Sequence, residues 1–433
     1  MSVPAEEAVD SSTDVSWARS LDEHDPLAGA RDQFHIPIGP DGAKQVYLVG
    51  NSLGLPTVAT KEKVEIELDR WAALGVAGHT TGDRAWVSYH QLLTGSMAAL
   101  VGALPEEVVT MNSLTVNLHL QMISFYRPTP GRHKILIEAG AFPSDHFAVE
   151  SQIRQRGLDP AHSLVVVGPR PGEATLHTDD LLAAIEQHGP ELALVLLPGV
   201  QYYTGQVLPM ADIARVAHHQ GAAVGFDLAH AVGNIPLALH DWDVDFAAWC
   251  TYKYLNGGPG GVGGAFVHQR HVADPARPKL LGWWGTRADT RFEMATAFEA
   301  IPTVESWALS NPPILCLAAL RASLDVFDAW GPMARLRAKT ERQLAYLDFL
   351  LDELVGDRVR AITPRARHQR GCQVSLQVTD RRHDGHGVQR ALEQHGVACD
   401  WRHPDVIRIA PVPLYTSYED IHRFVTILDA ILR

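Results

Sequence analysis

The chain has 433 residues, a formal net charge of -13 and a hydrophobic fraction of 46%. This length exceeds one simple core, so we expect two domains, or one large domain with an appendage. The acidic balance argues against a nucleic-acid partner, because phosphate binding needs clustered Lys and Arg, and no apolar run is long enough to span a membrane. Four widely spaced cysteines and the lack of a secretory signal favour a cytoplasmic protein with reduced thiols.

The N-terminal region predicts an arm followed by the first elements of a folded domain. Residues 1 to about 30 are rich in Asp, Glu, Ser and Ala, so we expect this region to begin as a frayed tail. A short strand is expected at 46–49, and apolar residues at helical spacing predict helices at 61–74 and 86–101. Between these helices lies a glycine-punctuated loop with His79, which either is exposed or lines a pocket.

A capped helix is expected just after residue 111. Asn112 or Ser113 is the predicted N-cap, and the helix is expected to end near Phe125. The free N–H groups at such an N-terminus attract a phosphate, and the hydroxyl of Thr115 would add a further contact. An ordinary capped helix without a ligand is the alternative.

From residue 134 the sequence alternates between strand and helix patterns, and Ser144 is expected to cap one of the helices. The predicted elements are buried strands at 134–138, 164–167, 192–197 and 222–227, helices at 178–187 and 210–219, and a further strand, antiparallel or not, at 263–267. This alternation favours a mostly parallel sheet covered on both faces, with ligands at the carboxyl ends of its strands.

Two of these strand ends carry the residues of greatest chemical interest. One apolar strand runs into Asp227, and the apolar run 246–250 leads to Lys253, which a glycine-rich segment follows. Burial favours the neutral, nucleophilic form of a lysine amine, which Schiff-base chemistry with an aldehyde cofactor requires. A buried carboxylate keeps the ring nitrogen of pyridoxal phosphate protonated. The two strand ends together are therefore more specific for this cofactor than either residue alone.

Each of these residues also has an ordinary structural interpretation. A lone lysine at a strand end usually extends its amine into solvent, and a lone aspartate often caps a helix. His230, three residues after Asp227, is one of 22 histidines, for most of which a structural role is the better interpretation.

The C-terminal part predicts a smaller domain. An irregular region at 281–313 ends in Asn311 followed by proline, which marks a helix start. The predicted elements beyond it are helices to about residue 330 and at 333–354, 388–395 and 418–432, and strands at 373–378 and 406–410. Arg408 is expected to point outward from the last strand, where it is either a solvated charge or the clamp for a substrate carboxylate.

Several motifs together give the chain a resemblance to the kynureninase family that extends over nearly its whole length. These motifs are YLVGNSLG at 47–54, MNSLTVNLHL at 111–120, AFPSDH at 141–146, FDLAHAVGN at 226–234, YKYLN at 252–256, GWWG at 282–285 and RIAPVPLY at 408–415. The resemblance implies an α/β protein of the pyridoxal phosphate fold type I. Its large domain, 46–312, would hold a mostly parallel seven-stranded sheet covered by helices. A smaller α+β domain would occupy 313–433, and an N-terminal arm, 1–45, would precede both and pack with the small domain.

The resemblance also assigns roles to matching residues. Lys253 matches the Schiff-base lysine, Asp227 the partner of the pyridine nitrogen, and Tyr252 a phosphate-contacting tyrosine that assists proton transfer. The further cofactor-binding matches are Leu114, Thr115, Phe142, Asp145, His230, Trp283 and Asn311. The substrate-binding matches are His79, Ser310, Asn311 and Arg408.

A homodimer with shared active sites is implied, because Trp283 and Asn311 match positions supplied across a dimer interface. Pro198 stands where many members have a hydroxyl residue, which removes one expected cofactor hydrogen bond. The implied reaction is hydrolysis of L-kynurenine or 3-hydroxy-L-kynurenine to anthranilate or 3-hydroxyanthranilate plus L-alanine, in tryptophan catabolism or NAD biosynthesis. Lys253 would remove the Cα proton as a general base.

Other functions compete with this one. A cysteine desulfurase needs a thiolate on an exposed loop, whereas Cys316 lies in an apolar helical run and Cys372 beside a strand. A class V aminotransferase would pass the amino group to a keto acid instead. A protein that binds the cofactor without turnover is disfavoured by Tyr252 and Arg408 beside the cofactor residues. A metal hydrolase is disfavoured because the sequence has no HExxH or comparable ligand spacing, so no metal is expected.

Overall fold

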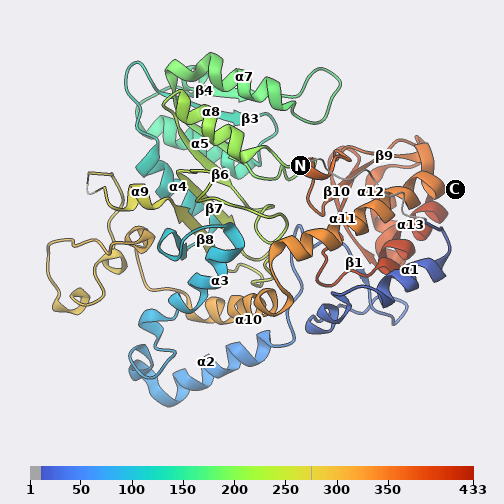
Figure 1. Cartoon of the computed structure of the whole chain (residues 1–433), viewed down its shortest axis with the longest axis horizontal. Coiled ribbons are helices and arrows are strands. Elements are labelled where there is room, and N and C mark those ends of the chain that lie inside the picture. The colour runs from blue at the N-terminus through green and yellow to red at the C-terminus, as the bar shows by residue number, and fades with distance from the viewer. Residues whose placement is uncertain (1–10, 275) are drawn as a thin grey trace, which may run out of the picture.

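The structure is a computed structural model that describes residues 11–274 and 276–433. A seven-stranded sheet in the order β2-β8-β7-β6-β5-β3-β4 forms the centre of the larger part of the molecule (Figure 1). Strands β4, β3, β5, β6 and β7 pair in parallel, whereas β8 runs antiparallel to both β7 and β2. The strands are β2 Val108–Thr110, β3 Lys134–Glu138, β4 Leu164–Val167, β5 Leu192–Pro198, β6 Ala223–Asp227, β7 Phe246–Cys250 and β8 Gly263–Val267.

Helices cover both faces of this sheet, which explains why its strands are almost continuously apolar. On β3, Ile135 and Ile137 join a core on one face with residues of α4 and α5, while Leu136 joins the core on the opposite face with residues of α3, α7 and α8. The helices are α3 Gln91–Val101, α4 Leu114–Phe125, α5 Pro143–Gln155, α6 Pro160–Ser163, α7 Thr178–His188, α8 Met210–His219 and α9 Gln269–Val272.

Two local expectations need correction in this part. Strand β4 is not buried, because it is the last strand of the sheet and has one open edge, and half of the Val166 surface is exposed. The helix expected from residue 86 begins only at Gln91, since residues 86–88 form a separate short turn of 3-10 helix. The antiparallel option for β8 is confirmed.

The smaller part of the molecule is built on a four-stranded antiparallel sheet in the order β12-β13-β10-β9. Its elements are β9 Val359–Ala361, β10 Val374–Val378, β12 Asp400–Arg402, β13 Val406–Ile409, α11 Met333–Leu350, α12 Gly385–Gln394 and α13 Tyr418–Leu432. A separate core, with Leu347, Leu376, Ile407 and Phe424 among its members, holds these elements together. The predicted α/β architecture with a smaller C-terminal α+β unit is therefore confirmed.

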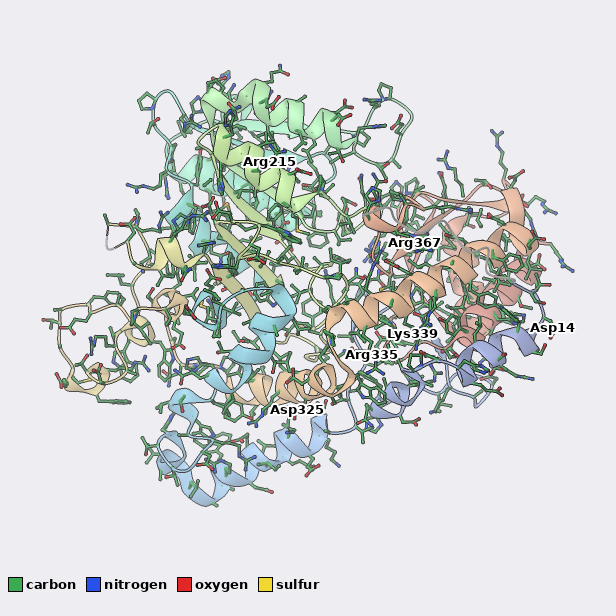
Figure 2. The ribbon with its side chains drawn as sticks, viewed as in Figure 1. Asp14, Arg215, Asp325, Arg335, Lys339 and Arg367 are labelled. Carbon is green, nitrogen blue, oxygen red and sulfur yellow. The ribbon has the colours of Figure 1, made fainter. Side chains whose placement is uncertain are left out.

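The N-terminal segment lies against this smaller unit. Helix α1, Val15–Glu23, packs on α13, and strand β1, Val46–Tyr47, pairs in parallel with β11, Val397–Ala398 (Figure 1). Lys339 of α11, labelled in Figure 2, makes a buried ion pair of 2.7 Å with Asp25. The chain is thus ordered from Val15 onward, and residues 1–10, where the frayed beginning was expected, lie outside the described part.

Helix α10, Ile314–Trp330, joins the two units. It packs against α2, Thr60–Leu74, where Lys63 pairs at 2.6 Å with Asp325, which Figure 2 labels on α10. The boundary at residue 313 stays a prediction, and this packing favours a position after α10. Within the described residues, every helix is too short or too polar to cross a bilayer.

Candidate active site

A cavity of about 190 Å³ lies at the carboxyl edge of the large sheet. Four parallel strands each end in a residue that lines it: Glu138 on β3, Pro198 on β5, Asp227 on β6 and Cys250 on β7. The parallel topology alone brings these four strand ends together, as it does in other open α/β sheets. Eight of the predicted site residues line the same cavity: Leu114, Thr115, Phe142, Asp145, Asp227, His230, Tyr252 and Lys253.

Lys253 reaches this cavity from a tight turn after β7. The N–H of Gly257 donates to the carbonyl of Thr251 at 2.8 Å, and a Cβ added at Gly257 would lie 2.5 Å from the Thr251 hydroxyl, so only glycine fits there. The amine of Lys253 lies 2.9 Å from Nε2 of His230. Burial, and then the charge of Lys253, hold the pKa of His230 well below its usual value, so His230 is a neutral acceptor.

Three carboxyl groups face one another across the cavity. Burial raises the pKa of Glu138 to about 8, and the charge of Asp227 adds to this effect. Burial also raises the pKa of Asp145 well above its usual value, again together with the charge of Asp227. Asp227 is held by the backbone N–H of Ala229, which donates to its Oδ1 at 2.7 Å. The arrangement concentrates acidic groups where a cationic ring nitrogen would be stabilised.

Hydroxyl groups and two helix N-termini form another part of the wall. Ser113 occupies the N-cap of α4 without capping the helix through its side chain, which leaves N–H groups available. The hydroxyls of Thr115 and Ser144 lie 2.7 Å apart. The expected cap at Ser144 is wrong, because Phe142 holds the N-cap position of α5 and Pro143 opens the helix. Together these donors suit a phosphate group.

The other predicted site residues do not line this cavity. Ser310 and Asn311 line a second cavity together with Trp284, and the ring of His79 contacts Trp86 edge-on, with 5.3 Å between the ring centroids. The side chain of Trp283 remains 41% exposed. One copy of the chain therefore does not bring these residues to the Lys253 cavity.

Arg408 is buried, with only 1% of its surface exposed, so its predicted outward orientation is wrong. Its Nε donates to Asp400 at 2.7 Å and its Nη2 also bonds that carboxylate, while Nη1 donates to the carbonyl of Tyr202 at 2.7 Å. The side chain of Tyr202 lines the Lys253 cavity. Arg408 thus lies directly behind a wall of the cavity.

Sequence reasoning missed several residues of the site, notably Glu138, Tyr202, Cys250 and Asp400. Glu138 and Cys250 end apolar strands exactly as Asp227 does, so the same signal would have found them. Tyr202 and Asp400 lie in segments without a comparable pattern, and only the folded chain places them beside the cavity and Arg408.

The fold matches that of several solved enzyme structures. A structure titled as a C-DES mutant with glycine covalently linked to its PLP cofactor aligns with a TM-score of 0.76 at 19% identity, over 92% of this chain and 99% of that one. The cysteine desulfurase CsdA of Escherichia coli aligns with a TM-score of 0.74 at 17% identity, over 94% and 98%. The fold is therefore that of the cystine lyases and cysteine desulfurases.

Sequence comparison narrows this class to one family. Kynureninases of Myxococcus xanthus (strain DK1622), Koribacter versatilis (strain Ellin345) and Xanthomonas campestris pv. campestris (strain B100) are 54%, 52% and 55% identical, over 95–96% of this chain and 96% of theirs. The family profile described as the Kynureninase C-terminal domain matches residues 336–428. The chain belongs to the kynureninase family.

Proposed function

We propose that the protein is a pyridoxal phosphate-dependent kynureninase that hydrolyses L-kynurenine, 3-hydroxy-L-kynurenine or both, to the corresponding anthranilate and L-alanine. One observation carries this proposal. In a chain of this family, Lys253, Asp227 and Thr115 line the same cavity. We place it in tryptophan catabolism or NAD biosynthesis, in the cytoplasm.

The residues present fit the cofactor. Two buried atoms in the cavity wall, Oδ1 of Asp145 and Nδ1 of His230, have no hydrogen-bond partner within the described chain. Such atoms usually face a ligand or water. Lys253 would hold the aldehyde carbon and Asp227 the ring nitrogen. Leu114 and Thr115, with the α4 N-terminus, would hold the phosphate, while Phe142 would stack on the ring. When bound, the cofactor supplies an electron-accepting ring that stabilises negative charge at the substrate Cα.

The chain's own residues would move the protons. Lys253, whose amine lies within hydrogen-bond distance of the neutral His230, is positioned as the general base for the Cα proton. Burial, followed by the neighbouring Cys250, raises the pKa of Tyr252, so this phenol keeps its proton and can donate it during cleavage of the Cβ–Cγ bond. The buried guanidinium of Arg408 would attract the substrate α-carboxylate.

A homodimer would complete the substrate side of the site. His79, Trp283, Ser310 and Asn311 lie away from the Lys253 cavity of their own chain. The segment around Trp283 also exposes large apolar side chains, namely Leu280, Leu281, Phe292 and Met294. Exposed apolar patches of this kind mark protein interfaces. We propose that this segment of each chain packs against the other and brings Trp283 and Asn311 to the partner's cavity.

The test compares purified wild-type protein with Lys253→Ala and with Lys134→Ala, a control in which a lysine paired with Glu191 at the surface is removed. Wild type and the control should release fluorescent anthranilate and alanine from kynurenine without any keto acid and show the absorbance of lysine-bound cofactor. Lys253→Ala should lose both. Turnover that requires a keto acid, or a Lys253→Ala variant that keeps both properties, would exclude the proposal.

A further inference from the structure

We propose that Glu107, His240 and His268 form a binding site for one divalent transition-metal ion, such as zinc, at the edge of the large sheet opposite to the active site. Glu107 precedes β2, His240 lies in the connection between β6 and β7, and His268 directly follows β8. Because β8 is antiparallel to β2 and β7, the start of β2 and the end of β8 meet at the amino edge of the parallel strands. None of the three residues lines the Lys253 cavity.

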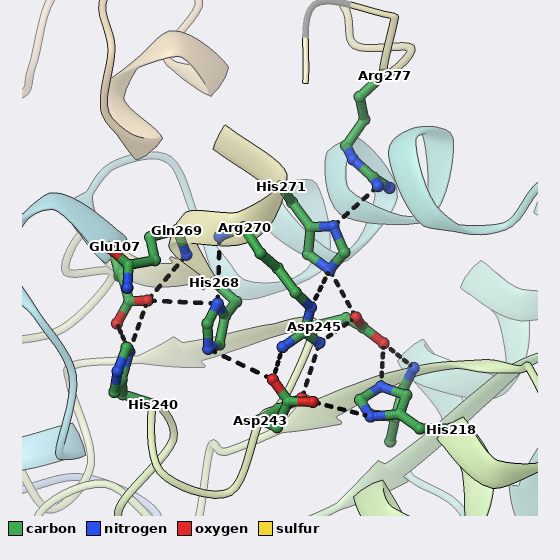
Figure 3. A network of polar contacts seen from close by, with 11 residues as sticks. Glu107, His218, His240, Asp243, Asp245, His268, Gln269, Arg270, His271 and Arg277 are labelled. Carbon is green, nitrogen blue, oxygen red and sulfur yellow. Dashed lines mark hydrogen bonds and ion pairs between the residues drawn. The ribbon is translucent and has the colours of Figure 1, made fainter. Parts of the chain in front are cut away.

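The three side chains already converge. Nδ1 of His240 lies 2.9 Å from one oxygen of Glu107 and 3.1 Å from the other, and Nδ1 of His268 lies 3.7 Å from Glu107. The two imidazole rings are nearly parallel, with their centroids 4.9 Å apart (Figure 3). One ligand atom from each residue lies within 4.8 Å of the others. Zinc bonds of about 2.0–2.1 Å require ligand atoms roughly 3.4 Å apart, so side-chain movements of about 1 Å would close the site.

The surroundings orient His268 as a metal ligand. Its Nδ1 accepts the backbone N–H of Arg270 at 3.3 Å, so Nδ1 carries the lone pair and Nε2 the proton. An ion that binds Nδ1 has to displace this long hydrogen bond, because the nitrogen has only one lone pair. Nε2 in turn faces a carboxylate oxygen of Asp243 at 3.6 Å. A metal-bound histidine typically donates its second ring N–H to a carboxylate in this way.

Glu107 is a fully buried carboxylate whose side-chain partners are histidines rather than a lysine or an arginine. Its surface is fully buried, and within the described residues no lysine or arginine forms an ion pair with it. The nearby Arg270 directs its guanidinium to Asp243 and Asp245 instead (Figure 3). A buried carboxylate without a permanently charged partner is costly, and a divalent ion would reduce this cost. The backbone N–H groups of Leu104 and Gln269 hold the carboxylate in place.

The ligand set indicates which ions fit. Two imidazoles and one carboxylate suit zinc and similar ions better than calcium or magnesium, which prefer all-oxygen sites. His240 is partly exposed, so an ion has a path from solvent, and a water molecule would complete the tetrahedral shell. On binding, the ion replaces the His240–Glu107 hydrogen bond, and the Nδ1 proton of His240 moves to Nε2 through solvent. The ion also replaces the hydrogen bond from the N–H of Arg270 to Nδ1 of His268, and this N–H is then left to water. The ion would tie together three separate segments of the large domain.

The test measures zinc binding to tag-free, cofactor-loaded protein after removal of metals with a chelator. Wild type should bind one zinc per chain in titration calorimetry, and cobalt at the same stoichiometry should give the visible absorbance of a tetrahedral site. His240→Ala should weaken zinc binding by at least about tenfold, and Asp243→Asn by a smaller factor. The matched control is His218→Ala, because His218 belongs to the same network but contacts only Asp243 and Asp245.

Affinity should also fall as the pH drops below about 6.5, where free histidines become protonated. The test changes His240 and Asp243 rather than Glu107, because the Glu107 carboxylate also holds the backbone N–H groups of Leu104 and Gln269, and its removal would disturb the fold there. The proposal would be overturned if wild-type protein binds no zinc, or binds it no more tightly than His240→Ala does. Any zinc still found would then be bound by histidines at the surface. Neither result would bear on the proposed enzyme activity, which the Lys253 cavity carries.

Discussion

The side-chain nitrogen of Lys253 lies 2.9 Å from Nε2 of His230. This contact joins the sequence motif at the end of β6 to the motif that follows β7. His230 is buried, and burial together with the charge of Lys253 holds its pKa low, so the ring accepts a hydrogen bond from the amine. The contact fixes the direction of the lysine side chain before the cofactor arrives.

Replacing His230 with Leu should weaken the binding of pyridoxal phosphate, because the ring that orients Lys253 also lines the cavity and would lose its contact with the bound cofactor. A hydrogen bond to a charged group contributes about 1.5–3 kcal/mol, which corresponds to roughly a 10- to 100-fold loss in affinity. Titration of cofactor-free protein, followed by the absorbance of lysine-bound cofactor, would measure this loss. His119→Leu, at a half-buried histidine outside the cavity, is the control and should bind the cofactor as wild type does. Equal affinities for both variants would contradict the assigned contact.

The pairing of Arg408 with Asp400 leads to a second prediction. Asp400 holds the guanidinium through Nε and Nη2, so Asp400→Asn should let Arg408 turn away from the cavity wall. We expect KM for kynurenine to rise by about tenfold or more, while the cofactor absorbance stays unchanged. Asp352→Asn, which breaks a comparable but exposed pair with Arg365, should leave KM as it is. A decrease in kcat with unchanged KM would argue against a positioning role for Asp400.

The sequence located those site residues that a simple rule of chain topology brings together. Asp227 and Lys253 were predictable because the carboxyl ends of neighbouring parallel strands share one edge of the sheet. The orientation of Arg408 was not, because its burial depends on Asp400, which lies opposite to it on the antiparallel strand β12. The alternation of apolar and polar residues along one strand predicts which face a side chain is on. It does not predict which residue of a separate strand lies beside that side chain. For the same reason, no local spacing relates Glu107 to His240 and His268.

Glu138 gives the cofactor-free protein a predictable pH dependence. Its pKa is raised to about 8 in the folded state, above the value of about 4.3 expected when unfolded, so the fold favours the protonated form. Its contribution to stability is fully present below pH 4.3 and is lost as the pH rises through 8. Glu138→Gln should remove this dependence. The free energy of unfolding of the variant should therefore exceed that of cofactor-free wild type increasingly as the pH rises, by a few kcal/mol at pH 9.

Urea denaturation of both cofactor-free proteins between pH 5 and pH 9 would measure this difference. Glu150→Gln is the control, because Glu150 is partly exposed and lies outside the cavity. Parallel stability curves for wild type and Glu138→Gln would mean that Glu138 ionises normally in the fold.

Pro198 offers a way to add a contact rather than to remove one. It is the last residue of β5, lies opposite Asp227 in the sheet register and lines the cavity, but its side chain has no hydrogen-bonding group. Pro198→Ser would place a hydroxyl at the position where related enzymes are expected to carry one. A neutral hydrogen bond contributes about 0.5–1.5 kcal/mol, so the cofactor should bind roughly 2- to 10-fold more tightly. Pro198→Ala separates the hydroxyl from the loss of the proline ring and should not tighten binding. If Ser and Ala have the same effect on the dissociation constant, the hydroxyl does not reach the cofactor.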